Sequence, residues 1–207
     1  MSSKQDRLKY ADCMTYVRYR LDVVDRFLSR RVTTGYEIPD LETTCLQFRK
    51  VFELIAMSSL CANRGKCAEV MQRFDKMWNA SDILKFVETL NPHFYPVPIK
   101  RTFNDDPASG GTVSHVSGGF LTRAELVEAH GRCGDLLHAE NPYRAQDVSV
   151  DEWRQCFGEW NQKTRMLLKL HTTQLIDQDM QWWVVMRFGA DQPVQVAEMR
   201  AVARIQG

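Results

Sequence analysis

Arg132, Asp135 and His138 stand at three-residue steps in the stretch Arg132-Cys-Gly-Asp135-Leu-Leu-His138. Arginine keeps its charge at any cellular pH and binds phosphate oxygens through its fork of N–H donors. Histidine titrates near neutral pH, so it can accept or release a proton. A cation and an imidazole together can act on a phosphodiester. The same three residues could equally form an ion network on the surface.

A second Arg-x5-His spacing occurs at Arg165 and His171. Leucines and a methionine surround this copy, which favours a packed helix whose charged ends reach the solvent. We therefore interpret the second copy as structural. Its presence also shows that an arginine and a histidine can occur at this sequence spacing by chance.

Thr122 and Glu125 form a capping-box pattern, so a helix is predicted to begin at Arg123 and to carry the first copy. On a regular helix, Arg132 and His138 would lie about 120° apart around the axis. Both side chains would not easily reach one phosphate. Either the helix is distorted, or two helices meet.

Gly131 and Gly134 lie on the same predicted helix, where each glycine costs about 1 kcal/mol relative to alanine. Two glycines in four residues suggest that another backbone or a substrate approaches closely. We hypothesise a symmetric dimer that brings Arg132 of one copy near His138 of the other.

The remaining sequence predicts a mainly helical chain. Apolar residues at three- and four-residue steps predict helices over about 4–31, 40–63, 66–78, 81–90, 123–140 and 150–177. Prolines in 94–101 predict an extended edge segment, and turn formers in 103–120 predict a flexible loop beside the site. Alternating apolar residues predict a C-terminal β-hairpin at 179–207. We expect one domain, 1–207, with a helical bundle over 1–178.

Arg49 and Glu53 lie four residues apart on the most apolar predicted helix, which should be the central one. They should share a helix face and pair as ions partly removed from water. We interpret the pair mainly as structural. The alternative is that the two residues position the residues of an active site without contacting the substrate themselves.

The bulk composition limits the possible partners. A net charge of +1, from 27 basic and 26 acidic residues, gives no global attraction to nucleic acid or to an acidic membrane. Any RNA site must therefore be a local patch, for which Lys100, Arg101 and Arg144 are the candidates. The six cysteines are scattered without metal-site spacing, and no signal peptide or membrane span is evident. We expect a cytoplasmic protein without metal or cofactor.

Two stretches carry a resemblance to a known family. Cys45-Leu-Gln-Phe-Arg-Lys-Val-Phe-Glu-Leu-Ile-Ala-Met57 and Gly131-Arg-Cys-Gly-Asp-Leu-Leu-His-Ala-Glu-Asn-Pro-Tyr143 resemble uncharacterised bacterial members of the HEPN superfamily. The Arg-x5-His spacing on a later helix is similar to that of the superfamily. The resemblance implies a mainly α fold, a HEPN-like helical bundle, to which this chain adds a small C-terminal β-hairpin. Many members are metal-independent ribonucleases, and others are inactive.

The resemblance also implies roles for individual residues. His138 would act as general acid or base, and Arg132 would stabilise charge on the phosphorane. Asp135 would orient His138 or hold Arg132, and Tyr143 would stack a base or contact phosphate. The implied setting is a homodimeric toxin or phage-defence nuclease, with an antitoxin or defence component as a possible partner. The alternative is an inactive helical interaction or sensing module that binds a protein through this ridge and the Trp182-Trp183 pair.

Overall fold

Helices and one antiparallel sheet make up the described part of the chain. A computed structural model describes residues 4–63, 79–103, 111–138, 149–176, 179–189 and 191–200. The helices are α1 Lys4–Leu28, α2 Glu37–Asn63, α4 Ala80–Leu90, α5 Arg123–Leu137 and α6 Val150–Leu168. The strands are β1 Val97–Phe103, β2 Gly111–His115, β3 Leu170–Gln174, β4 Met180–Val185 and β5 Gln195–Arg200.

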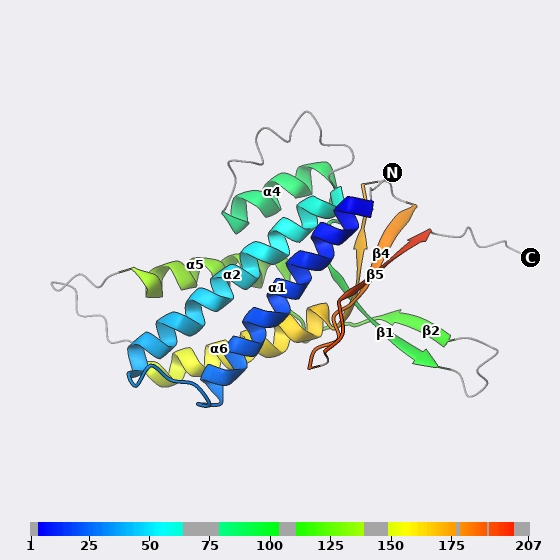
Figure 1. The fold of residues 1–207 in the computed structure, drawn as a ribbon. Coiled ribbons are helices and arrows are strands. Elements are labelled where there is room, and N and C mark those ends of the chain that lie inside the picture. The colour runs from blue at the N-terminus through cyan, green and yellow to red at the C-terminus, as the bar shows by residue number, and fades with distance from the viewer. Residues whose placement is uncertain are drawn as a thin grey trace, which may run out of the picture.

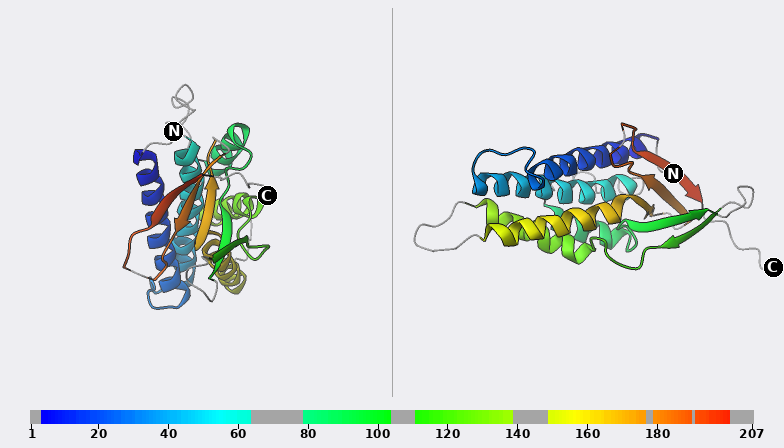
Figure 2. Two further views of the ribbon diagram at one scale, coloured as in Figure 1. Left: turned by 90° about the vertical axis from the view of Figure 1, so that its right-hand side faces the viewer. Right: turned by 90° about the horizontal axis from the view of Figure 1, so that it is seen from below.

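Helix α2 is the central helix, as predicted, because it packs against α1, α4, α5, α6 and β3. Its most extensive packing is against α1, and aromatic rings join it to α6. Phe48 of α2 stacks on Phe157 of α6 with ring centroids 5.5 Å apart, and Trp160 meets Phe48 edge to face at the same distance. Such pairs add to the free energy gained by burying the rings alone. The layer of α1 and α2 lies over α5 and α6 (Figure 2).

The prediction of a mainly α bundle with only a small hairpin is wrong. The sheet has five antiparallel strands in the order β2-β1-β3-β4-β5, so the predicted hairpin, β4 and β5, is part of a larger sheet. It lies at one end of the long helices, with β1 and β2 pointing away from them (Figures 1 and 2). The fold is therefore mixed α and β.

Strand β3 accounts for most of this error. Helix α6 ends at Leu168 rather than near residue 177, and β3 begins at Leu170 after a single intervening residue. His171, Thr172 and Thr173 in the strand are all buried. A strand buried on both faces has no alternation of apolar and polar residues by which sequence could distinguish it from a helix.

Two further predictions also need correction. The proline-rich segment contributes to β1, which lies between β2 and β3 rather than at the edge of the sheet. It pairs with β3 only at Val97 and Pro98, so the missing N–H of the proline is confined to the end of the strand. The predicted loop at 103–120 contains β2, while 104–110 lie outside the described residues.

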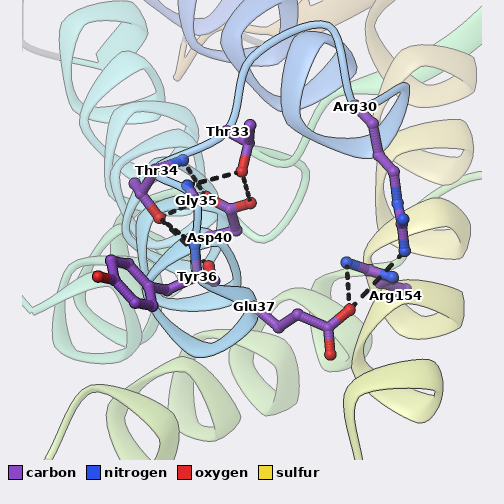
Figure 3. Close-up of polar contacts among 8 residues, drawn as sticks. All are labelled: Arg30, Thr33, Thr34, Gly35, Tyr36, Glu37, Asp40 and Arg154. Carbon is purple, nitrogen blue, oxygen red and sulfur yellow. Dashed lines mark hydrogen bonds and ion pairs between the residues drawn. The ribbon is translucent and has the colours of Figure 1, made fainter.

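The connection from α1 to α2 is held by polar contacts (Figure 3). The carboxylate of Asp40 accepts hydrogen bonds from the hydroxyls of Thr33 and Thr34, at 2.7 and 2.8 Å, and from the Thr34 amide at 2.6 Å. Burial raises the pKa of Asp40, but these donors outweigh it and hold the pKa below its usual value. Glu37, at the start of α2, lies 3.4 Å from the guanidinium of Arg154 on α6. The turn thus ties α1, α2 and α6 together.

Candidate functional site

Helix α5 begins where the capping box predicts. The Thr122 hydroxyl accepts a hydrogen bond from the Glu125 amide at 3.2 Å, and the Glu125 carboxylate accepts one from the Thr122 amide at 2.8 Å. Lys163 of α6 donates to the same carboxylate at 2.6 Å. The Lys163 contact first, and the Thr122 amide second, lower the pKa of Glu125 to about 2. These contacts fix the start of α5 against α6.

His138 is the residue at which α5 ends. Its backbone has left the helix, with φ −80° and ψ 139°, and the residue is exposed. The helix therefore stops at Leu137, earlier than the predicted end at Asn141. Tyr143 and Arg144, two predicted substrate-binding residues, lie outside the described residues.

Arg132 is directed toward α6. Its guanidinium carbon lies 5.1 Å from the ring centroid of Trp153 and 5.7 Å from that of Trp160. One of its N–H groups donates to the Sγ atom of Cys156 at 3.3 Å. Cation–π contact of this kind stabilises a guanidinium over an aromatic ring. The tryptophans of α6 therefore fix the position of the predicted catalytic arginine.

The pocket beside Arg132 is more acidic than a phosphate site. It has a volume of about 170 Å³ and includes the side chains of Glu125, Glu128, Glu159 and Lys163. Three carboxylates face two cations here, and Lys163 is already paired with Glu125 at 2.6 Å. A phosphate would meet repulsion as well as attraction in this pocket.

The three residues of the predicted ridge are not in mutual contact. Among the residues that the structure describes, neither Asp135 nor His138 makes a side-chain hydrogen bond or ion pair, and both are exposed. The contacts of Arg132 are all with α6. Asp135 therefore neither orients His138 nor holds Arg132 in this state.

Arg49 and Glu53 do pair, within a larger cluster between α2 and α5. Arg49 Nε lies 3.3 Å from Oε1 of Glu53, and Lys50 Nζ lies 2.9 Å from its Oε2. His130 of α5 approaches Oε1 at 3.6 Å through Nε2. Burial, followed by the charge of Arg49, lowers the pKa of His130, and contact with Glu53 only partly opposes this. The imidazole is thus held neutral beside a carboxylate that two cations already neutralise.

Sequence reasoning did not assign Lys50 or His130 to this cluster. The spacing of Lys50 from Glu53, three residues on a helix, was a usable signal, because such pairs are neighbours on the helix surface. The contact of His130 with Glu53 joins residues of two helices distant in sequence. Periodicity within one helix could not reveal it.

Arg49 also lies beside α5 one turn before its end. A side-chain carbon built on Gly134 would lie 3.6 Å from Nη1 of Arg49. Residue 138 follows residue 134 by about one helical turn. Two guanidiniums therefore flank α5: that of Arg49 on the α2 side and that of Arg132 on the α6 side.

Lys100 and Arg101 lie far from His138 within one chain. Both are exposed residues of β1, opposite Ser114 and Val113 of β2. Helix α5 ends at the opposite end of the molecule from β1 and β2 (Figures 1 and 2). Lys100 and Arg101 would contact an RNA bound at His138 only if the RNA extended along the molecule, or if a second copy of the chain supplied these two residues.

The second Arg-x5-His copy spans two elements rather than one helix. Arg165 of α6 lies 2.7 Å from the Asp25 carboxylate, while His171 of β3 is completely buried. Its Nδ1 lies 2.9 Å from the Leu168 carbonyl and its Nε2 lies 2.8 Å from the Tyr10 hydroxyl. Both residues make structural contacts, but the packed helix predicted for this copy ends before His171.

Comparisons with protein-family models, with curated proteins and with solved structures found no match to this chain. Within the described ranges, no group of three or more histidine, cysteine, aspartate or glutamate residues is arranged to hold a metal ion. None of the described helices combines the length and the apolar character needed to cross a membrane.

Proposed function

We propose that this chain is a metal-independent endoribonuclease in which His138 transfers the protons. The observation that carries the proposal is an exposed imidazole at the end of α5, with guanidiniums on both flanks of that helix. The resemblance of the two stretches around Arg49 and His138 to uncharacterised members of the HEPN superfamily, many of whose members are ribonucleases, supports this activity. The expected setting is the cytoplasm, as a toxin or defence enzyme.

The proposed reaction needs only groups of this kind. His138 removes the proton from a ribose 2′-hydroxyl, whose oxygen attacks the adjacent phosphorus. The bond to the 5′-oxygen breaks, and that oxygen takes up a proton. The products are a 2′,3′-cyclic phosphate and a 5′-hydroxyl end. A guanidinium stabilises the charge that develops on the phosphorane oxygens.

The source of that guanidinium distinguishes two forms of the proposal. In the dimeric form, Arg132 of one copy serves His138 of the other, which requires Arg132 to turn away from Trp153 and Trp160. In the single-chain form, Arg49 supplies the charge from α2. Its position beside Gly134 favours the single-chain form, because Arg132 is turned toward α6 and acidic neighbours.

Cleavage of mixed RNA in EDTA tests the activity. His138→Ala should abolish cleavage, while His115→Ala, at an exposed histidine of β2, should leave it unchanged. Arg49→Ala and Arg132→Ala are compared with Arg31→Ala, at an exposed arginine of the α1–α2 connection. Loss of one arginine that contributes to transition-state charge should lower the rate by about a hundredfold or more. Cleavage that survives in His138→Ala would contradict the proposal.

Mixing inactive variants separates the two forms. If the site combines two copies, co-refolded Arg132→Ala and His138→Ala chains should recover part of the activity, since one of the two sites in a mixed dimer is intact. If Arg49 and His138 act within one chain, co-refolded Arg49→Ala and His138→Ala chains should recover no activity, because each chain lacks one of the two residues. Light scattering on the same samples gives the oligomeric state.

A second candidate function is a catalytically inactive module that binds a protein partner. The observation that favours it is the pocket around Arg132, in which three glutamates disfavour a polyanion such as RNA. Intact RNA with the wild-type chain in every condition above would favour this candidate.

A further inference from the structure

A groove between α1 and α2 has the features of a ligand site separate from α5. Its volume is about 290 Å³, near the lower end of the roughly 300–1,000 Å³ typical of ligand pockets. It is lined by Tyr16, Arg20, Lys50, Glu53, Leu54 and Met57. Charged groups and apolar groups are both present, which suits an amphipathic ligand.

The groove carries an excess of positive charge. Arg20 and Lys50 line it, and its single carboxylate, that of Glu53, is shared by Lys50 at 2.9 Å and by Arg49 at 3.3 Å. Because two cations line the groove against one carboxylate, which Arg49 also neutralises from outside the groove, an anion entering it meets net attraction.

Arg20 has an unused donor. Its Nη1 donates to Oε1 of Gln47 at 2.9 Å, but its Nε is buried and has no hydrogen-bond partner within the described ranges. Because Nε is out of reach of solvent, a ligand would bind the terminal N–H groups of this guanidinium, of which only Nη1 donates to Gln47. A phosphate or carboxylate oxygen is the acceptor that a guanidinium edge fits best.

Tyr16, about one turn before Arg20 on α1, offers a surface for a flat ring. Tyr16 is 57% exposed, and its ring meets that of Tyr19 edge to face at 6.5 Å, so much of its surface stays open. Leu54 and Met57 contribute apolar surface from α2. Stacking on an exposed aromatic ring suits a nucleobase-like group.

We propose that this groove binds a small aromatic phosphate ester, with a nucleoside monophosphate as the type of ligand. The phosphate accepts hydrogen bonds from Arg20 and pairs with Lys50, and the base stacks on Tyr16. A nucleoside monophosphate is about the largest ligand that the groove volume suits. The proposal does not depend on ribonuclease activity.

Isothermal titration calorimetry of the full chain with AMP tests the proposal. We expect a Kd between roughly 10 µM and 1 mM, as for other ligands with few contacts. Adenosine, which lacks the phosphate, and inorganic phosphate, which lacks the ring, should each bind about tenfold more weakly or not at all. Arg20→Gln and Tyr16→Ala should each weaken AMP binding by about tenfold.

Matched variants show whether the loss is specific. Arg26→Gln replaces an exposed arginine of the last turn of α1, which does not line the groove. Arg26→Gln and His138→Ala should bind AMP as the wild type does, and so should Tyr36→Ala, at an exposed tyrosine of the α1–α2 connection that does not line the groove. Thermal unfolding of each variant checks that it is folded. Failure of the wild type to bind AMP, or equal binding by Arg20→Gln and Tyr16→Ala, would overturn the proposal.

Discussion

The hydroxyl of Tyr10 on α1 lies 2.8 Å from Nε2 of His171 on β3, and both residues are completely buried. Nδ1 of this histidine lies 2.9 Å from the Leu168 carbonyl, which can only accept, so Nδ1 carries the proton. Nε2 of the neutral ring therefore accepts from Tyr10, whose oxygen accepts in turn from Thr173 at 3.0 Å. The Tyr10 hydroxyl and both ring nitrogens of His171 therefore have hydrogen-bond partners.

The first prediction concerns pH. Burial lowers the pKa of His171 to about 4, below the value of about 6.5 expected in the unfolded chain. Between these values the unfolded chain binds a proton that the folded chain does not. The neutral His171 thus makes its full contribution to the free energy of unfolding above about pH 6.5. This contribution decreases as pH falls toward 4, by up to about 3 kcal/mol. Urea unfolding at pH 7 and pH 4.5 measures it.

A neutral replacement isolates this contribution. His171→Gln should be less stable at pH 7 but should lose less stability than the wild type between pH 7 and pH 4.5. His93→Gln, at an exposed histidine before β1, should follow the wild type. An equal loss in His171→Gln and the wild type would show that other groups cause the acid dependence.

The second prediction concerns the glycines of α5. Nothing described lies within 4 Å of a side-chain carbon at Gly131, and at Gly134 the nearest atom, Arg49 Nη1, is in ordinary contact at 3.6 Å. Gly131→Ala and Gly134→Ala should therefore each stabilise the isolated chain by about 0.5–1 kcal/mol, because alanine favours the helix. Denaturant unfolding measures this change. Destabilisation by Gly131→Ala, together with a weakened dimer in light scattering, would instead indicate that a second copy packs there.

The third prediction concerns the α1–α2 connection. Asp40→Ala removes the acceptor shared by Thr33 and Thr34, and should lower the free energy of unfolding by about 1–2 kcal/mol. Glu42→Ala, at an exposed residue one turn into the same helix, should change it by less than about 0.5 kcal/mol. Equal effects would mean that the turn does not depend on the Asp40 carboxylate.

Local signals in the sequence predicted local features of the site well. The capping box set the start of α5, and the spacing of Arg49 and Glu53 predicted their ion pair. Helix geometry also indicated that Arg132 and His138 diverge. The direction of Arg132 was not predictable, because it depends on Trp153 and Trp160, which contact it only through tertiary packing.

The sheet was harder to predict than the helices. Strands β4 and β5 follow each other in the chain, and Trp182 and Val184 show the buried alternation of a hairpin. Strand β1, by contrast, pairs with β3 about seventy residues later, at Val97 with Thr172. Such pairings leave no mark in any short window of sequence.

The bond between Tyr10 and His171 has a consequence for biosynthesis. The two residues are 161 positions apart, so α1 cannot complete its buried contacts until β3 has left the ribosome. Most of the packing of α1 is against α2, which follows it directly in the chain and can cover its apolar face earlier. Contacts that close so long a loop also form slowly. Helix α1 is made first, but the buried hydroxyl of Tyr10 should find its partners only after β3 has been made.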